Sequence, residues 1–392
     1  MLIGGKGQVS LKEHRGGRRT HVAEQEMEGG SVQSPEQRRD ALVERFFGSC
    51  IGFMEILSIY VGDRLGFYRT LVDNGGATAS QLADATGTNE RYAREWLEQQ
   101  AVAGILVVED ADAQPEDRRY RLPEGHDEVL LERDSLYYAA PFARQMVSIT
   151  RPLPAVLEAF RTGGGVPYPD YGEDMREGIA YGNRPMLVNL MGTEWLPAVP
   201  DVHERLQADP PARVADIGCG TGWSSISIAR AYPKVRVDGF DLDEDSIAEA
   251  KANAEAEGLT DRVTFQVRDA ADPELSGRYD LAIAIECIHD MSRPVEALRA
   301  MRSMVGNHGA VLVVDERVGE DFTAPSDEIE RLMYGYSIVH CLPVGMAEQP
   351  SAGTGTVMRP ATLRRYATEA GFSELEILPI ENELWRFYRL VS

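Results

Sequence analysis

The 392-residue chain is poor in cysteine. It contains four, Cys50, Cys219, Cys287 and Cys341, and they lie far apart in the sequence. Because no Cys-x-x-Cys pair occurs, we expect neither a disulfide framework nor a structural zinc site, and the sequence predicts no metal. This cysteine usage suits a reducing cytoplasm.

The sequence also lacks long apolar runs and an excess of positive charge. No apolar stretch is long enough to cross a membrane, and the first residues lack the apolar core of a secretion signal. The 40 Lys and Arg residues face 63 Asp and Glu residues, which gives a formal net charge of −23. A surface that acidic repels phosphate backbones. We therefore expect a cytoplasmic protein that binds neither membranes nor nucleic acid.

Apolar residues make up 43% of the chain and charged residues 26%, which is ordinary for a globular protein of two or three domains. Residues 1–36 are rich in Gly, Arg, Gln and Ser and have no apolar periodicity, so they predict a disordered tail. Residues 37–150 show helical patterns and then two short strand patterns, "ILVVE" and "RRYRLPE". This order of helix, turn, helix and β wing is typical of a winged helix.

The second helix of that motif, at about residues 90–103, would be the one to enter a DNA groove. It carries three glutamates against Arg91 and Arg94, so its charge is a poor match to phosphates. We favour a dimerisation role, in which the apolar helices before the motif form the interface. DNA binding remains the alternative.

Residues 151–210 are expected to be a largely helical linker on the substrate side. They include a loop rich in glycine and aromatic residues, "GGGVPYPDYGED". Glycine and proline mark a bend there. Tyr168 and Tyr171 in this loop either pack in the core or line a pocket.

Residues 211–392 alternate between strand and helix patterns. Five strand segments, from "RVADIG" to "AVLVVDE", are separated by helical patterns and predict a parallel sheet covered on both faces. The last two strands, "LEILPI" and "LWRFYRL", are separated by only three residues, too few for a crossover helix. They must therefore pair as an antiparallel hairpin. The fold class is α/β: a Rossmann-like seven-stranded sheet that ends in an antiparallel hairpin and follows a mostly helical winged-helix domain.

The first of these strands runs into a glycine loop, "GCGTG". A dinucleotide fingerprint requires a third glycine where this chain has Trp223, and the indole argues against a tightly bound pyrophosphate. The carboxylate of Asp216, just before the loop, also disfavours a diphosphate and suits a cation.

Two further acids follow at strand ends. Asp241 stands about 20 residues after the loop, where an acid accepts hydrogen bonds from ribose hydroxyls. Asp269 ends the third strand, where it can accept a hydrogen bond from an adenine amino group. A ligand with adenine, ribose, a cation and no phosphate has the features of S-adenosylmethionine.

The segments "DIGCGTG", "GFDLD" and "VRDA" occur in this order, and residues 211–392 resemble a class I S-adenosylmethionine-dependent methyltransferase domain. The whole chain resembles actinobacterial small-molecule methyltransferases with an N-terminal winged-helix dimerisation domain. The resemblance implies a homodimer and S-adenosylmethionine as cofactor. It implies cofactor contacts at Asp216, Gly218, Gly220, Asp241 and Asp269, adenine flanked by Leu242 and Ala270, and Glu286 on the methionine side.

The fourth strand runs into "ECIHDM". Small-molecule O-methyltransferases of this family have a His-Asp pair in the corresponding place followed by Trp, whereas here His289-Asp290 is followed by Met291. We expect His289 to act as the general base that removes the proton of a hydroxyl acceptor. Asp290 would orient the substrate or cap the next helix, and Glu316 would hold the imidazole or the substrate. The expected activity is O-methylation of a small molecule in specialised metabolism.

A long insertion, residues 317–360, follows the fifth strand, and we expect it to form a lid over the acceptor pocket. The alternative is that its central helix packs on the N-terminal domain. The candidate lining residues of the lid are Met333, Tyr334, Ser337, His340 and Cys341.

The main rival function is a transcription regulator that senses S-adenosylmethionine. A hydrolase is disfavoured because the sequence lacks the Gly-x-Ser-x-Gly motif, and a base-modifying methyltransferase is disfavoured because it lacks the Asn-Pro-Pro run.

Overall fold

The computed structural model describes residues 33–269, 272–275 and 279–392. The tail expected over residues 1–36 therefore lies outside the described residues up to residue 32, as does Ala270. The chain divides into two compact units, with the boundary between Val147 and Ser148.

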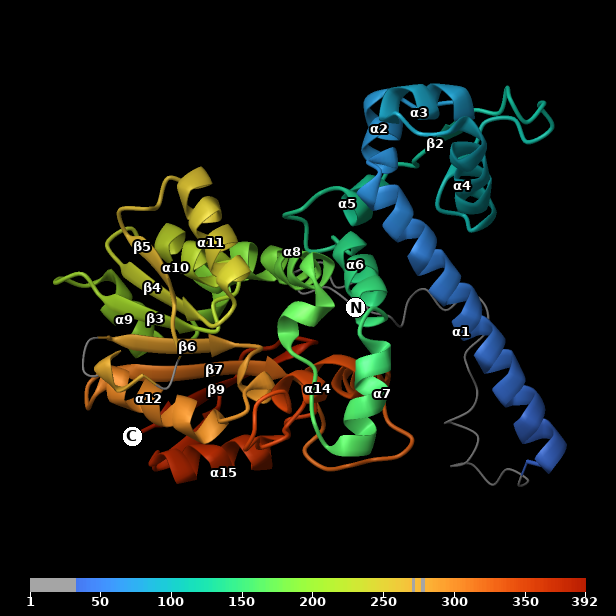
Figure 1. Ribbon diagram of the computed structural model, residues 1–392. Helices are drawn as coiled ribbons and strands as arrows, with labels where there is room; N and C mark the ends of the chain where they lie inside the picture. Colours follow the sequence, from blue (N-terminus) through green and yellow to red (C-terminus); the bar gives the residue numbers. More distant parts are fainter. Residues whose placement is uncertain (1–32, 270–271, 276–278) are drawn as a thin grey trace. The chain divides into compact units, whose positions relative to one another are not determined.

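The N-terminal unit begins with one long helix, α1, drawn in blue in Figure 1. Its start is fixed by a capping box, in which Ser34 and Gln37 each accept a hydrogen bond from the other's backbone amide, and by Pro35 in the first turn. Helices α3 and α4 form the helix-turn-helix, and β1 and β2 pair antiparallel as the wing, so the predicted winged helix is confirmed. The bounds are α1 Pro35–Arg64, α2 Phe67–Asp73, α3 Ala79–Thr86, α4 Glu90–Val102, β1 Val107–Val108, β2 Tyr120–Arg121, α5 His126–Leu130 and α6 Ala140–Ile149.

The core of this unit is built around Trp96 of α4. The indole packs edge-on against Phe67 and Tyr68, and its Nε1 donates a hydrogen bond to the carbonyl of Ser58 in α1 at 2.8 Å. A Cβ at Gly62 would come within 2.3 Å of the same indole. The C-terminal part of α1 is thus packed into the winged helix.

The C-terminal unit contains a seven-stranded sheet with the order β5-β4-β3-β6-β7-β9-β8. All neighbours are parallel except that β9 runs antiparallel to both β7 and β8, which confirms the predicted terminal hairpin. Strand β3 lies between β4 and β6, where the order of strands reverses, and open α/β sheets bind ligands at such a point. The strands are β3 Arg213–Ile217, β4 Arg236–Asp241, β5 Val263–Val267, β6 Leu281–Ile285, β7 Ala310–Glu316, β8 Glu374–Ile377 and β9 Trp385–Val391.

Helices cover the sheet because its central strands are apolar on both faces; every residue of β7 is buried. Helices α12 and α15 lie side by side, and α10 packs with α8 and η2 (Figure 1). None of the described helices combines the length and the apolar character needed to span a bilayer. The helices of this unit are α7 Leu153–Thr162, η1 Tyr168–Tyr171, α8 Glu173–Leu190, η2 Met191–Trp195, α9 Pro200–Gln207, α10 Trp223–Ala231, α11 Glu244–Ala256, η3 Pro273–Leu275, η4 Ile288–Asp290, α12 Pro294–Val305, α13 Glu328–Tyr336, η5 Ser337–Cys341, α14 Leu342–Gly345 and α15 Pro360–Ala370.

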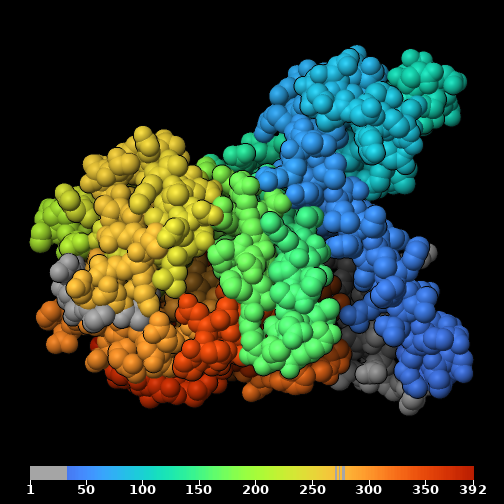
Figure 2. Space-filling model, viewed as in Figure 1, coloured from blue at the N-terminus to red at the C-terminus, as the bar shows by residue number. Residues whose placement is uncertain are grey.

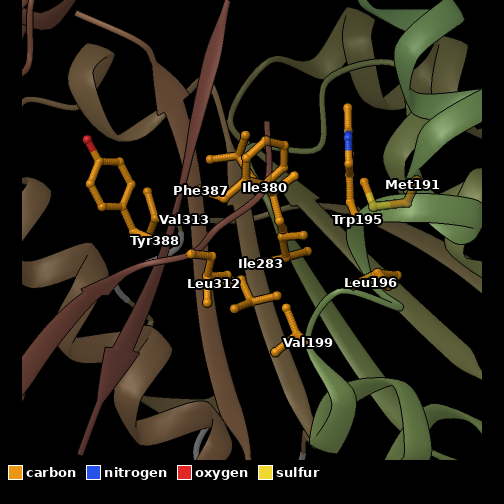
Figure 3. Close-up of a pocket in the computed structure, with 12 residues that line it drawn as sticks. Met191, Trp195, Leu196, Val199, Ile283, Leu312, Val313, Ile380, Phe387 and Tyr388 are labelled. Atoms are coloured by element: carbon orange, nitrogen blue, oxygen red, sulfur yellow. The ribbon is translucent and has the colours of Figure 1, made fainter. Parts of the chain in front are cut away.

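One face of the sheet carries a small apolar gap between the strands and the segment from η2 to α9 (Figure 3). Met191, Trp195, Leu196 and Val199 face Ile283 across it, and no lining residue carries a formal charge. Ligand sites need a few converging polar groups besides their apolar walls. We therefore regard the gap as an imperfection of packing.

The segment between β7 and α15 folds as α13, η5 and α14. It packs on the loop that contains the two tyrosines: the amide of Val166 donates to the carbonyl of Pro343 at 2.9 Å, and the hydroxyl of Tyr171 donates to the carbonyl of Val339 at 2.8 Å. In Figure 2 the green surface of the tyrosine loop region adjoins the orange-red surface of this segment. The two segments therefore pack on each other, and the predicted role of residues 317–360 as a lid stays a prediction.

Candidate active site

The glycine loop after β3 has a backbone that only glycine adopts readily. Gly218, Gly220 and Gly222 have φ values of 64°, 51° and 84°, all in the left-handed region. A Cβ at Gly218 would lie 2.7 Å from Cβ of Cys287, and one at Gly222 would lie 2.5 Å from the ring of Phe265. A Cβ at Gly220 would meet nothing within 4 Å. The loop is therefore packed at both ends and open above its middle glycine.

Asp216 lies behind this loop and is only 1% exposed. Its Oδ2 accepts hydrogen bonds from the hydroxyls of Ser224 and Ser225, at 2.5 and 2.6 Å, in the first turn of α10. Burial raises the pKa of this carboxyl to about 6 in spite of those two bonds. The described contacts of Asp216 thus fix the loop to α10, and its contact with a ligand cation stays a prediction. Sequence reasoning missed the two serines.

Asp241 ties the end of β4 to the glycine loop. Its Oδ2 accepts a hydrogen bond from the amide of Gly220 at 2.9 Å, and its Oδ1 accepts one from the amide of Asp243 at 2.9 Å. Burial raises the pKa of this carboxyl. Each carboxylate oxygen has a further lone pair for a ligand hydroxyl, so Asp241 is placed where the sequence predicted it.

The other residues predicted to flank adenine are more exposed. The side chain of Leu242 is 62% exposed beside Asp241. Asp269 is half-exposed and forms an ion pair with Arg293 at 3.0 Å. Arg293 comes from the start of α12, and no sequence motif indicated it. An adenine amino group would share the carboxylate of Asp269 with this guanidinium.

Two side chains from before the sheet reach the ligand side of the loop. The guanidinium of Arg184, in α8, lies 3.7 Å from the ring centroid of Trp223, and the buried indole Nε1 of Trp223 has no hydrogen-bond partner. Burial and the carboxylates of Asp241 and Asp243 raise the pKa of Tyr168. The ring of Tyr168 lies edge-on to His340 with centroids 6.0 Å apart, and the choice between packing and pocket stays open.

Glu286 follows β6 with a φ of 51°, the one positive value at a non-glycine residue in the part of the chain that the structure describes. Asn183 of α8 and the indole Nε1 of Trp385 in β9 donate hydrogen bonds to its two carboxylate oxygens. Burial raises the pKa of Glu286 to about 7. Strained backbone of this kind collects at functional sites. Sequence reasoning found Glu286 but neither of its partners.

His289 is 2% exposed in the short helix η4, and its ring is held by Asp315. Nδ1 of His289 and Oδ1 of Asp315 are 2.8 Å apart, and the same oxygen accepts a hydrogen bond from the amide of Glu316 at 3.0 Å. The expectation that Glu316 holds the imidazole is therefore wrong. Successive side chains of a strand alternate between its faces, so only one of this pair meets the ring.

Nε2 of His289 lies 3.3 Å from Oδ1 of Asp290. Burial by itself lowers the pKa of His289, but the carboxylates of Asp315 and Asp290 outweigh it and raise that pKa well above its ordinary value. The two carboxylates therefore favour the protonated imidazole.

Glu316 is buried near the same group, and its Oε2 has no hydrogen-bond partner. Burial and the carboxylate of Glu286 raise its pKa well above the ordinary value. A raised pKa favours the protonated carboxyl, which is the form able to donate a hydrogen bond. The alternative role predicted for Glu316, contact with the substrate, stays open.

Four of the five candidate lid residues are buried, whereas Tyr334 is 38% exposed. The ring of His340 packs edge-on against Tyr171 with centroids 4.6 Å apart, and its Nδ1 lies 3.4 Å from Sγ of Cys341. Nε2 of His340 is buried without a hydrogen-bond partner. The buried side of this segment therefore carries the polar groups of Ser337, His340 and Cys341, and its role as a lid stays a prediction.

Residues 208–349 match the family described as methyltransferase domain, and residues 54–132 match the Rv2258c-like winged HTH domain. The ajmaline N-methyltransferase of Rauvolfia serpentina is 30% identical over 119 residues, which cover 30% of this chain and 40% of that protein. The match thus spans less than half of this curated relative.

Solved structures share the fold over nearly the whole chain. Human N-acetylserotonin methyltransferase in complex with S-adenosylmethionine is 18% identical, with coverage of 93% of this chain and 99% of that chain and a TM-score of 0.64. An O-methyltransferase family protein from Burkholderia thailandensis is 16% identical, with coverage of 92% and 99% and a TM-score of 0.63. At these identities the likeness establishes the architecture.

Proposed function

We propose that this protein methylates a hydroxyl group of a small molecule. The proposal starts from the class I S-adenosylmethionine-dependent methyltransferase domain of residues 208–349, which follows a winged-helix domain in the sequence. The observation that carries the proposal is the pairing of His289 with Asp315. His289 follows β6, and Asp241, the acid expected to bind ribose, ends β4, which lies two strands away in the sheet. A buried histidine with a carboxylate on Nδ1 is an arrangement suited to proton removal.

The site fits S-adenosylmethionine, the cofactor of this domain family. The opening above Gly220 admits a ligand close to the backbone, and the lone pairs of Asp241 suit ribose hydroxyls. The unpartnered Nε1 of Trp223 offers a hydrogen bond to a ligand acceptor. Asp269 and Leu242 would border the adenine, and Glu286 would lie toward the methionine portion. When bound, the cofactor supplies a methyl group on a sulfonium centre.

His289 would do the proton chemistry. The carboxylate of Asp315 binds Nδ1 and so fixes the orientation of the ring. Nε2 is then the nitrogen that would contact the hydroxyl group of the methyl acceptor. Nε2 would take the hydroxyl proton, and the carboxylates of Asp315 and Asp290 would stabilise the imidazolium that results. Much of the remaining rate would come from holding the acceptor oxygen in line with the methyl group.

A screen with the full-length protein and S-adenosylmethionine tests the function. Candidate phenols, alcohols and amines would be incubated with both, and mass spectrometry would detect the gain of one methylene. We expect methylated hydroxyl compounds. Products methylated only on nitrogen would keep the transferase assignment and refute the hydroxyl acceptor; the N-methyltransferase name of the Rauvolfia relative makes amines a necessary arm.

Substitution of Asp315 by asparagine should move the pH profile of turnover to lower pH. The base form of His289 exists only above its raised pKa, so turnover should fall as the pH drops through that value. Asparagine keeps an oxygen for Nδ1 but removes the charge, which should lower the pKa of His289 and with it the inflection. The profile of kcat against pH measures this, with Asp245→Asn, an exposed carboxylate on α11, as the control. An unmoved inflection would separate Asp315 from the chemistry.

The middle of α1 supports the further proposal of a homodimer. From Leu42 to Met54, across the middle of the helix, apolar side chains are exposed singly or in adjacent pairs about one turn apart, and an exposed apolar patch on one helix marks an interaction site. A symmetric interface would bury each side chain twice, once in each protomer. The exposed residues are Leu42, Val43, Phe46, Phe47, Ile51 and Met54.

Replacement of Phe46 and Phe47 by serine should convert the dimer to a monomer. These rings are 70% and 66% exposed, and burial of each would contribute about 1.5–3 kcal/mol. Light scattering after size-exclusion chromatography measures the mass. Tyr92→Ser on α4, which is 79% exposed, is the matched control and should leave the dimer intact. A wild-type monomer at micromolar concentration would contradict the proposal.

A regulator that senses S-adenosylmethionine is the second candidate, because the matched N-terminal family is a winged HTH domain. On α4, however, Arg91 pairs with Glu95 at 2.5 Å and Arg94 pairs with Glu90 at 3.4 Å. Both arginines of the would-be recognition helix are thus neutralised by neighbours one turn away. We expect no shift of genomic fragments in a gel at moderate salt, with or without the cofactor.

A further inference from the structure

We infer that His289, Asp290 and Cys341 form a binding site for Zn²⁺ or a similar transition-metal ion. One ligand atom from each residue lies within 4.8 Å of the other two, and the His289 and Cys341 side chains are buried. The site was invisible to motif reasoning because Cys341 is about fifty positions away from the His-Asp pair. The fold brings η4 and η5 together.

The histidine is already arranged as a metal ligand. Asp315 engages Nδ1 at 2.8 Å, so the lone pair of a neutral imidazole would be on Nε2, toward Asp290. Metal-bound histidines commonly donate their other N–H to a carboxylate, which fixes the tautomer and strengthens the ligand. Asp315 would take this supporting place.

The distances suit a tetrahedral ion after small side-chain movements. Nε2 of His289 and Oδ1 of Asp290 are 3.3 Å apart, about the spacing of two ligands that each bind zinc at roughly 2.0–2.2 Å. Oδ1 of Asp290 has no hydrogen-bond partner, although it is buried from solvent. The metal-free arrangement thus leaves this oxygen with only the charge contact to Nε2 of His289, at the position where an ion would bind both atoms.

The backbone holds the two ligand segments in place. The amide of Gly355 donates to the carbonyl of His289 at 3.2 Å, and a Cβ at Gly345 would lie 3.2 Å from the carbonyl oxygen of Asp290. His340 adds a neighbour to the sulfur, since its Nδ1 lies 3.4 Å from Sγ of Cys341. The site is therefore built into the packing of the lid segment on η4.

The donor set selects the class of metal. One imidazole, one thiolate and one carboxylate are ligands for zinc and other borderline or soft ions, whereas Mg²⁺ and Ca²⁺ require oxygen donors. Three protein ligands leave a fourth position for water. On binding, Cys341 releases its thiol proton to solvent, an imidazolium form of His289 likewise releases the proton on Nε2, and the metal takes the lone pair of that nitrogen.

A consequence rests on the proposed function. The lone pair that holds the metal is the one that would accept the hydroxyl proton, so Nε2 cannot serve both. Zinc should therefore inhibit methyl transfer in proportion to its occupancy, and magnesium should not.

Binding is tested on the full-length protein after dialysis against a chelator. Competition with a chromogenic chelator should show one tightly bound Zn²⁺ per chain. Cys341→Ser and Asp315→Asn should each weaken binding by at least about tenfold. Cys50→Ser, which removes the exposed cysteine of α1, should not. Equal zinc affinity in wild type and Cys341→Ser would overturn the inference.

Cobalt gives a readout that needs no Cys341 variant. Co²⁺ added to the Cys50→Ser protein should produce a thiolate-to-cobalt charge-transfer band in the near ultraviolet, and zinc should displace it. Absence of that band would also overturn the inference. Failure of methyl transfer in the metal-free protein would count against the proposed function alone, because neither binding measurement depends on turnover.

Discussion

Replacement of His289 by alanine should reduce turnover by about 10²- to 10⁴-fold at saturating acceptor, and by at least tenfold if the acceptor is unusually acidic. The reason is the loss of the group that withdraws the hydroxyl proton at the strand end beside the glycine loop. Cofactor affinity should remain nearly unchanged, because the described contacts of His289 are with Asp315, Asp290 and the lid segment. Steady-state kinetics and calorimetry with S-adenosylmethionine measure the two quantities separately.

Two further variants distinguish the loss of the base from a loss of folding. Alanine leaves the buried Asp315 unpaired, which is itself destabilising. His289→Gln can still donate a hydrogen bond to Asp315 but cannot act as a base at neutral pH, so it should lose the same activity. His308→Gln removes an exposed histidine between α12 and β7 and should change nothing. Wild-type turnover in either His289 variant would remove this residue from the mechanism.

Asp241→Ala should weaken binding of S-adenosylmethionine by about 10- to 100-fold, the range expected for hydrogen bonds to a charged group. The carboxylate would lose its bonds to ribose, and the amides of Gly220 and Asp243 would lose their acceptor. Calorimetry measures the change, and Asp245→Ala on the neighbouring helix is the control. Adenosine should also lose affinity, because it carries the ribose whose hydroxyls Asp241 would bind.

The same titrations decide between cofactor classes. The wild-type protein should bind S-adenosylmethionine and its demethylated product and should ignore NAD, since Trp223 stands where a dinucleotide site needs glycine. Undiminished binding of S-adenosylmethionine by Asp241→Ala would refute the ribose role of this acid. Preferential binding of NAD would refute the cofactor itself.

The sheet was predictable because its signals are local. Each parallel strand is an apolar run followed by a helix, and three intervening residues before the last strand forbid a crossover. The glycine loop was equally predictable, because alternating glycines after a strand indicate a backbone with positive φ values. The winged helix followed from the order of two short helical patterns and two strand patterns; in the structure Thr78 and Asn89 cap the two helices.

The partners of the site residues were not predictable, because they come from elements distant in sequence. Nothing near His289 indicates that Asp315 meets its ring, or that Trp385 and Asn183 share the carboxylate of Glu286. The choice between Asp315 and Glu316 depends on which face of β7 each side chain occupies. One residue of register decides that, and it is set by pairing with β6 and β9.

The hydrogen bond from Trp385 to Glu286 has a consequence for the order of synthesis. Trp385 belongs to β9, which is translated after β3, β4, β5, β6 and β7 and pairs against β7. A ribosome-bound chain that already displays the glycine loop still lacks the indole that holds Glu286. The carboxylate of Glu286 therefore gains this partner only after the strand translated last has docked on the sheet.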